Sequence, residues 1–125
     1  MKNTLDENKP IFLQIKEQLE DSIISGNVKA MERVPSTNEF ASFYQINPAT
    51  AAKGINELVN ENILFKKRGV GMFVTENAKE LLIQKHQETF YENFILPIKS
   101  EARKLRIDKE DLIAMINKEA DSNGN

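Results

Sequence analysis

The sequence contains no cysteine, which excludes disulfide bonds, thiol chemistry and thiolate metal sites. It also has no apolar run near the roughly 18 residues that a membrane span needs, and its first residues lack the apolar core of a signal peptide. These absences favour a cytoplasmic protein without a membrane partner. With 125 residues, 40% hydrophobic and 29% charged, the chain fits one compact domain plus a short appendage.

An excess of basic residues, which often marks a nucleic-acid-binding protein, is missing as well. Lys and Arg total 17 against 19 Asp and Glu, and the parts before and after residue 78 are both slightly acidic. Such a protein still binds DNA if its positive charges gather on one face. Its non-specific affinity should then be weak, and binding should depend on specific contacts and on dimerisation.

The sequence offers no catalytic constellation. It shows no nucleophile with a plausible base, no glycine-rich phosphate loop after a strand and no cluster of metal ligands. His86, the single histidine, is interpreted as a helix-surface residue rather than a ligand. We therefore expect no enzyme activity, no cofactor and no bound metal.

Two helix starts lie close together in the first half of the chain. Ser36 and Glu39 have the S-x-x-E spacing of a capping box, which predicts a helix over about 37–44. Asn47-Pro48 predicts a second start, because Asn is a preferred cap and Pro suits the first helical position. The second helix should cover roughly 48–60, after a tight turn.

The flanking segments complete a recognisable unit. Apolar residues spaced three or four apart predict an amphipathic helix from Pro10 to near Gly26. After the central helices, residues 63–65 predict a strand and residues 72–75 its return, joined by a basic tip with glycines at 66–71. Helix, turn, helix and basic hairpin in this order describe a winged helix-turn-helix, which places one helix in a DNA groove.

Beyond residue 77 the apolar spacing predicts a helical arm. Pro97 should interrupt or kink its long helix, Asp108 should cap a last helix, and residues 121–125 should fray. The arm has more apolar surface than a short appendage buries alone, which favours a subunit interface. The candidate interface residues are Leu82, Phe90, Tyr91, Phe94, Ile95 and Ile98.

The predicted fold class is therefore mainly α with a small β wing. Residues 1–77 should form the winged helix-turn-helix domain and residues 78–125 the dimerisation arm. Plainer interpretations exist for the two DNA-facing elements, since the second central helix could be a core helix with a solvated polar face and Lys66-Lys67-Arg68 an ordinary solvated hairpin tip. The short turn and the following wing favour DNA binding, as do small residues such as Ala49, which let a helix settle into the major groove.

Several short motifs together resemble those of the GntR family of bacterial transcription regulators. The resemblance rests on Val34-Pro35-Ser36, on Asn56-Glu57-Leu58 and on the wing segment 67–74. The run over residues 46–53 and the short tail are similar to the small YtrA-like subfamily. The resemblance covers roughly residues 9–118, and its motifs are specific in combination.

The sequence also departs from the family pattern. Many members carry DNA-contacting arginines where this chain has Asn38, Pro48 and Ala52, and Lys53 is the one long cation on the second central helix. The family's base-reading scheme therefore does not transfer whole, whereas contacts that position the phosphates do. The candidate DNA-binding residues are Arg33, Ser36, Thr37, Asn38, Asn47, Pro48, Ala49, Thr50, Lys53, Lys67, Arg68, Gly69 and Gly71.

The resemblance implies a homodimeric regulator that binds a two-fold symmetric operator in double-stranded DNA. It further implies repression of the protein's own operon and of a neighbouring ABC-transporter operon. Larger relatives add a ligand-binding domain, whereas residues 78–125 are too few to enclose a pocket of the usual size, and the sequence names no small-molecule effector. The alternative is a winged-helix adaptor that binds protein and not DNA. Salt-sensitive binding to duplex DNA separates the two.

Overall fold

The computed structural model describes residues 5–120, so the tail predicted to fray lies outside the described residues. The chain forms two compact units, one ending at Lys85 and the other starting at His86. We call residues 5–85 the winged unit and residues 86–120 the C-terminal unit. Among the described helices, none combines the length and the apolar character that crossing a membrane requires.

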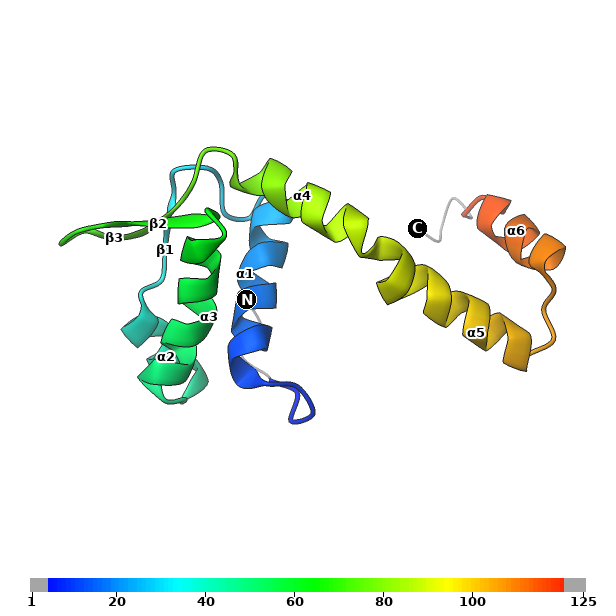
Figure 1. Ribbon diagram of the computed structural model, residues 1–125, viewed down its shortest axis with the longest axis horizontal. Helices are drawn as coiled ribbons and strands as arrows, with labels where there is room; N and C mark the ends of the chain where they lie inside the picture. Colours follow the sequence, from blue (N-terminus) through cyan, green and yellow to red (C-terminus); the bar gives the residue numbers. More distant parts are fainter. Residues whose placement is uncertain (1–4, 121–125) are drawn as a thin grey trace. The chain divides into compact units, whose positions relative to one another are not determined.

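Four helices and three short strands make up the winged unit. Its order is α1 (Ile11–Ile24), β1 (Arg33–Val34), α2 (Thr37–Tyr44), α3 (Pro48–Asn60), β2 (Leu64–Lys67), β3 (Gly71–Val74) and the first turns of α4 (Ala78–Glu88). Figure 1 shows α1 and α3 side by side, with α2 near the start of α3. The predicted winged helix-turn-helix is confirmed.

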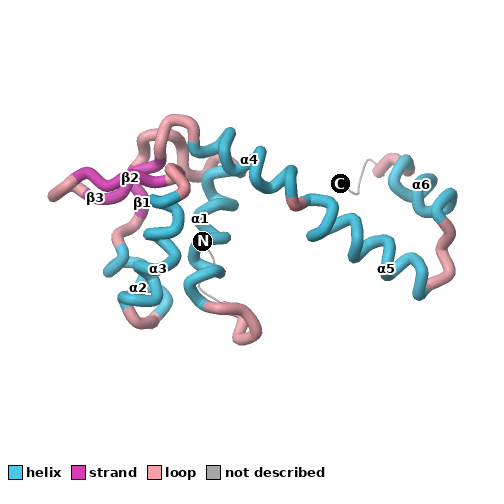
Figure 2. The backbone as a smooth tube through the Cα atoms, viewed as in Figure 1, coloured by secondary structure: helices cyan, strands magenta, loops and turns pink. Residues whose placement is uncertain are grey.

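The sheet is antiparallel with strand order β1-β3-β2, drawn in magenta in Figure 2. The sequence predicted β2 at 63–65 and β3 at 72–75, and it missed β1. Ile63 is excluded from β2 because its N–H donates to the Leu58 carbonyl at 2.9 Å and closes the end of α3. Strand β1 has two residues, too few to show the alternation of apolar and polar residues that predicts a strand. It forms because it pairs with β3.

One apolar core holds the winged unit together. Its side chains come from all four helices and from the inner face of the sheet, where Leu64 pairs with Val74. Ala78 and Leu82 of α4 are also fully buried in it. The helix predicted to begin the dimerisation arm therefore contributes its first turns to the winged unit.

An ionic network fastens α3 to its neighbours. The Lys16 ammonium lies 3.1 Å from Glu57 and 2.5 Å from Glu61, and Lys85 bridges Glu61 at 3.1 Å and Glu20 at 2.8 Å. Burial alone would lower the pKa of Lys16, but the two carboxylates hold that pKa above its ordinary value. Burial would raise the pKa of Glu61, and its hydrogen bonds to Lys16 and Lys85 hold that pKa below its ordinary value.

The C-terminal unit contains a π-helical turn and two helices: η1 (Tyr91–Ile95), α5 (Leu96–Lys104) and α6 (Lys109–Asn117). Pro97 lies in the first turn of α5, and the residues before it keep right-handed helical angles. The interruption or kink predicted there takes the form of a wider turn, which accommodates the missing N–H of Pro97. Asp108 caps α6 as predicted, accepting a hydrogen bond from the Asp111 N–H at 2.8 Å.

Candidate nucleic-acid interface

The start of α2 presents a complete capping box. The Ser36 hydroxyl accepts a hydrogen bond from the Glu39 N–H at 3.1 Å, and the Glu39 carboxylate accepts one from the Ser36 N–H at 2.8 Å. Hydrogen bonds from Ser36, aided by the nearby Arg33 guanidinium, hold the pKa of Glu39 below its ordinary value. Thr37 is half-buried and Asn38 exposed beside this cap.

The start of α3 is capped and accessible. The Asn47 side chain accepts a hydrogen bond from the Ala49 N–H at 2.8 Å, and Pro48 occupies the first turn as predicted. The outer side of α3 carries three exposed residues at helical spacing, namely Ala49, Lys53 and Asn56. The outer face of α3 carries small residues near its N-terminus, and its capping residue is not acidic. Both features suit entry of the helix into a DNA groove.

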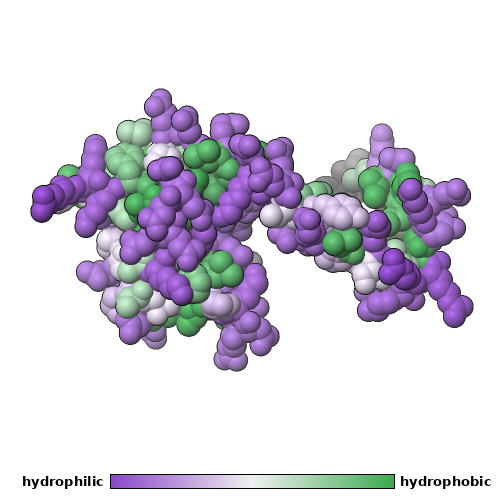
Figure 3. All heavy atoms as spheres, in the orientation of Figure 1, coloured by the Kyte–Doolittle hydropathy of each residue, from purple (hydrophilic) through white to green (hydrophobic). Residues whose placement is uncertain are grey.

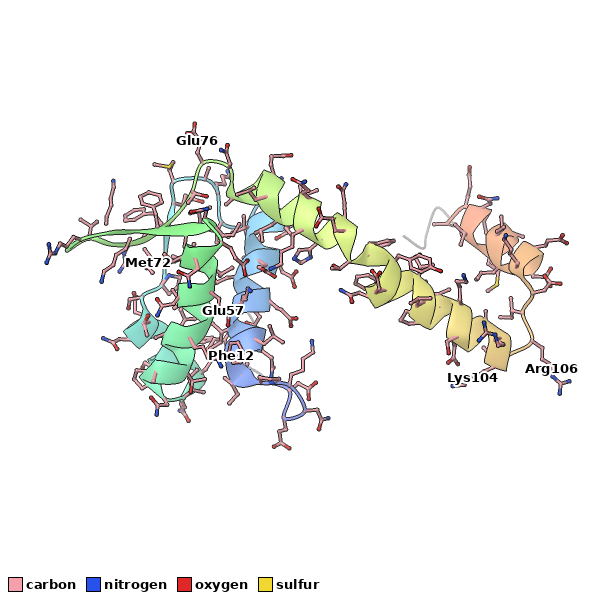
Figure 4. The ribbon with its side chains drawn as sticks, viewed as in Figure 1. Phe12, Glu57, Met72, Glu76, Lys104 and Arg106 are labelled. Carbon is pink, nitrogen blue, oxygen red and sulfur yellow. The ribbon has the colours of Figure 1, made fainter. Side chains whose placement is uncertain are left out.

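The Lys53 side chain packs against an aromatic ring of another helix. Its ammonium lies 4.0 Å from the centre of the Phe12 ring on α1. Figure 4 labels Phe12 on α1 and shows the neighbouring α3, which carries Glu57. A cation over an aromatic face gains about 0.5–1 kcal/mol at an exposed site. The ring therefore holds the one long cation of α3 in a defined place. Phe12, which was not among the predicted DNA-binding residues, becomes a member of the candidate interface.

The wing carries its cations at the tip of the β2–β3 hairpin. The Lys67 ammonium lies 5.0 Å from the centre of the Phe73 ring, and Arg68 is exposed with no ion pair to any described residue. Gly69 has φ +78° and Gly71 φ +142°, which are conformations that side chains rarely adopt. The turn therefore depends on glycine at both predicted positions.

Arg33 connects the wing to α2. Its guanidinium lies 3.2 Å from the Glu39 carboxylate, and its Nε donates to the Val70 carbonyl at 3.4 Å. A Cβ at Gly71 would lie 2.8 Å from the same Nε. The observed contacts of Arg33 are intramolecular, so they position the wing, while the residue remains exposed.

All thirteen predicted DNA-binding positions are exposed or half-buried, and none is buried. They belong to β1, the start of α2, the first half of α3 and the wing hairpin. In Figure 1 the hairpin and α2 lie on the side of α3 that is opposite to α1. The structure thus gathers on one unit the positions that the sequence spread over residues 33–71.

The predicted interface residues divide into two groups. Phe90, Phe94 and Ile98 are exposed by 51%, 57% and 45%, Tyr91 is exposed, and Ile95 is half-buried. Leu82 is fully buried in the core of the winged unit, so it is not available to a partner subunit. The sequence placed Leu82 with the others because helical spacing alone does not show which neighbour covers a face.

No metal site is found among residues 5–120, where no three His, Cys, Asp or Glu side chains gather suitably. His86 is half-buried on α4, close to the end of that helix.

Comparison with known proteins identifies the family. Residues 12–74 match the family described as "Bacterial regulatory proteins, gntR family". Over 75 residues the chain is 36% identical to the HTH-type transcriptional repressor YtrA of Bacillus subtilis (strain 168); the match covers 60% of this chain and 58% of YtrA, less than two thirds of its length.

Two solved structures extend the comparison. A GntR family transcriptional regulator from Listeria monocytogenes matches with TM-score 0.75 and 33% identity, over 92% of this chain and 99% of that one. AraR(DBD), solved in complex with operator ORX1, matches with TM-score 0.52 and 28% identity, over 60% of this chain and 92% of that one. With its motifs, its winged fold and these relatives, the chain belongs to the GntR family of bacterial regulatory proteins.

Proposed function

We propose that this protein is a sequence-specific DNA-binding transcriptional regulator and that it acts as a repressor. The observation that carries the proposal is the capped, accessible start of α3 beside a wing with exposed cations. The names of the matched relatives support it, since YtrA is called a repressor and AraR(DBD) was solved on an operator. A protein-binding adaptor would not need this arrangement of small residues and cations.

The candidate residues have different roles in this proposal. Ala49 and Pro48 let the backbone of α3 approach base edges and thymine methyl groups. Ser36, Thr37, Thr50 and Lys53 contact phosphates and fix the register. Lys67 and Arg68 bring the wing to the backbone, and the glycines allow a close approach.

The charge balance sets the expected strength of binding. Because the chain has a net charge of −2, non-specific attraction to DNA is weak. Specific affinity should exceed non-specific affinity by roughly a thousandfold or more at physiological salt. Equal affinity for operator and random duplex would contradict a sequence-specific regulator.

The test compares two variants of equal charge. Lys67→Ala with Arg68→Ala removes two exposed cations of the wing, whereas Lys29→Ala with Lys79→Ala removes two exposed lysines elsewhere on the winged unit. Fluorescence anisotropy with fragments of the protein's own promoter measures affinity against salt. We expect the wing variant to lower the salt slope by up to about one unit per lost phosphate contact, and the control to leave it unchanged. Equal effects of the two variants would contradict the assigned surface, and no salt-sensitive binding to any fragment would favour the adaptor.

We further propose that the regulator is a homodimer on a two-fold symmetric site. Phe90, Phe94 and Ile98 lie about one helical turn apart and are each about half exposed, which forms an apolar stripe on the C-terminal unit. Burying the exposed half of one phenylalanine contributes about 2 kcal/mol, and a symmetric contact uses each residue twice.

Sedimentation of full-length protein tests the dimer. We expect Phe94→Asp to shift the protein to monomer, while Phe43→Asp, at an equally exposed phenylalanine of α2, leaves association unchanged. A wild-type chain that sediments as a monomer at high micromolar concentration and on DNA would contradict the proposal. The target operons remain a prediction from the family resemblance, and a cytoplasmic location remains a prediction from the composition.

A further inference from the structure

The sheet of the winged unit has an outer face that does not contribute to the core. Residues paired across an antiparallel sheet lie on the same face, and Phe73 pairs with both Arg33 and Phe65. Met72, labelled in Figure 4, belongs to the opposite face and packs against the core. Neither Phe65 nor Phe73 is among the described residues that form this core or pack against it. Two phenylalanines therefore lie on the face of the sheet that points away from the core.

The two rings lie against each other. Their centroids are 5.8 Å apart and their planes differ by 28°. Both residues are half-buried, so part of each ring remains open to solvent. Figure 3 shows green apolar atoms beside purple polar ones over the strands of the winged unit. We call Phe65 and Phe73 the wing platform, because paired rings on a sheet face are a surface on which nucleic-acid bases stack in several binding modules.

Cations border the wing platform on the same face. The Lys67 ammonium lies 5.0 Å from the centre of the Phe73 ring, and the exposed Arg33 is the cross-strand neighbour of Phe73. The three strands contain no acidic residue, and the acid that meets this face is Glu39 of α2, 3.2 Å from the Arg33 guanidinium. The face is therefore positive although the chain has a net charge of −2.

Rings and cations together select the occupant. A base offers a flat ring for stacking, and its phosphate offers an anion to Lys67 and Arg33. In a duplex each base is stacked between its neighbours and does not reach such a ring, whereas an unpaired base does. Among the described residues, no cation lies over the Phe65 ring, so this ring is the one open to a base. We propose that the wing platform binds unpaired bases of a single-stranded nucleic acid, an activity separate from the proposed binding of duplex operator.

The test separates stacking from charge. The probe is a fluorescein-labelled oligothymidylate of about 15 nucleotides, a length within the site sizes of single-strand-binding proteins, and its partner is an abasic strand of the same length. Both carry the same phosphates, and only the first carries bases. In anisotropy titrations of full-length protein we expect the oligothymidylate to bind about tenfold more tightly, because stacking of a base on an aromatic side chain contributes at least that factor. An oligouridylate arm distinguishes RNA from DNA as the source of the strand.

Matched variants locate the site. Phe65→Val keeps a residue suited to a strand and should weaken oligothymidylate binding about tenfold, to the level of the abasic strand. Phe43→Val, at a 52% exposed phenylalanine of α2, should leave it unchanged. Duplex promoter fragments should bind Phe65→Val as they bind the wild type, which shows that the wing is intact. Phe65→Trp keeps a ring and adds the single tryptophan of the chain, whose fluorescence should be quenched by oligothymidylate and not by the abasic strand.

Several results would overturn the proposal. They are equal affinity of the wild type for oligothymidylate and the abasic strand, an equal loss in Phe43→Val, and an unquenched Phe65→Trp protein. Displacement of the oligothymidylate by polyglutamate at equal charge would assign the face to an acidic protein and would also overturn it. An equal loss of duplex binding in Phe65→Val would show that the ring serves the duplex instead. Wild-type protein that binds no duplex fragment would contradict the proposed function and would leave the wing platform to be judged by its own titrations.

Discussion

Gly54 is the position where α3 comes closest to α1. A Cβ built there would lie 2.5 Å from the Phe12 carbonyl oxygen and 3.4 Å from its carbonyl carbon. Both atoms belong to the backbone of α1, so no side-chain rotation relieves the contact. Gly54→Ala must therefore push the two helices apart in a unit whose core lies directly beside them.

The magnitude follows from two opposing effects. Alanine in a helix interior is favoured over glycine by about 1 kcal/mol. Against this, an ordinary contact is about 1 Å longer than the one that the Cβ would make, and overpacking a close-packed interior costs about 1–3 kcal/mol. Because backbone atoms must move, we expect the upper part of that range and a net loss of about 1–2 kcal/mol. For a unit of this size the loss corresponds to a Tm lower by roughly 5–10 °C.

Thermal unfolding followed by circular dichroism measures the effect. Asn56→Ala, at an exposed position of the same helix, supplies the control, since it gains helix propensity without a clash and should raise stability by about 0.5 kcal/mol. The two substitutions should thus shift Tm in opposite directions. A Gly54→Ala protein that is as stable as Asn56→Ala would refute the close approach of α1 and α3.

Other predictions concern the helix start and the ionic network. Ser36→Ala removes the hydroxyl of the capping box and should lower the free energy of unfolding by about 1 kcal/mol in urea titrations, whereas Ser42→Ala, exposed within α2, should change it by only a few tenths. The pKa of Glu61 is lowered in the folded state, so its contribution to stability is present above the ordinary pKa of 4.5 and is lost as the pH falls through the lowered value. Urea titrations from pH 7 to pH 3 should show a smaller loss in Glu61→Gln, and parallel profiles would contradict the network. Arg33→Met should loosen the wing, seen as faster amide exchange at Val70, and an unchanged exchange rate would count against that contact.

Much of the candidate DNA-binding surface was readable from short stretches of sequence. The caps of α2 and α3 depend on residues two or three positions apart, such as Ser36 with Glu39, so the sequence contains both partners of each contact. The turn at the wing tip likewise depends on glycines whose backbone angles few other residues adopt. The family motifs predict the order of these elements along the chain and do not predict any further contact.

Contacts between distant segments were not readable in this way. Lys16 meets Glu57, and Lys53 meets Phe12, only because α1 and α3 pack at Gly54. Helical spacing marked Leu82 and Phe90 alike as apolar arm residues, yet the first is buried in the winged unit and the second is exposed.

The sequence by itself thus determined the order of helices and wing and the candidate DNA-binding residues, because caps, turns and periodicity act over a few neighbouring positions. Only the tertiary structure decided where the winged unit ends and which cations are held by rings or carboxylates. Each of these features depends on which surfaces pack against each other in the fold. A local sequence pattern does not show which distant residues will be in contact.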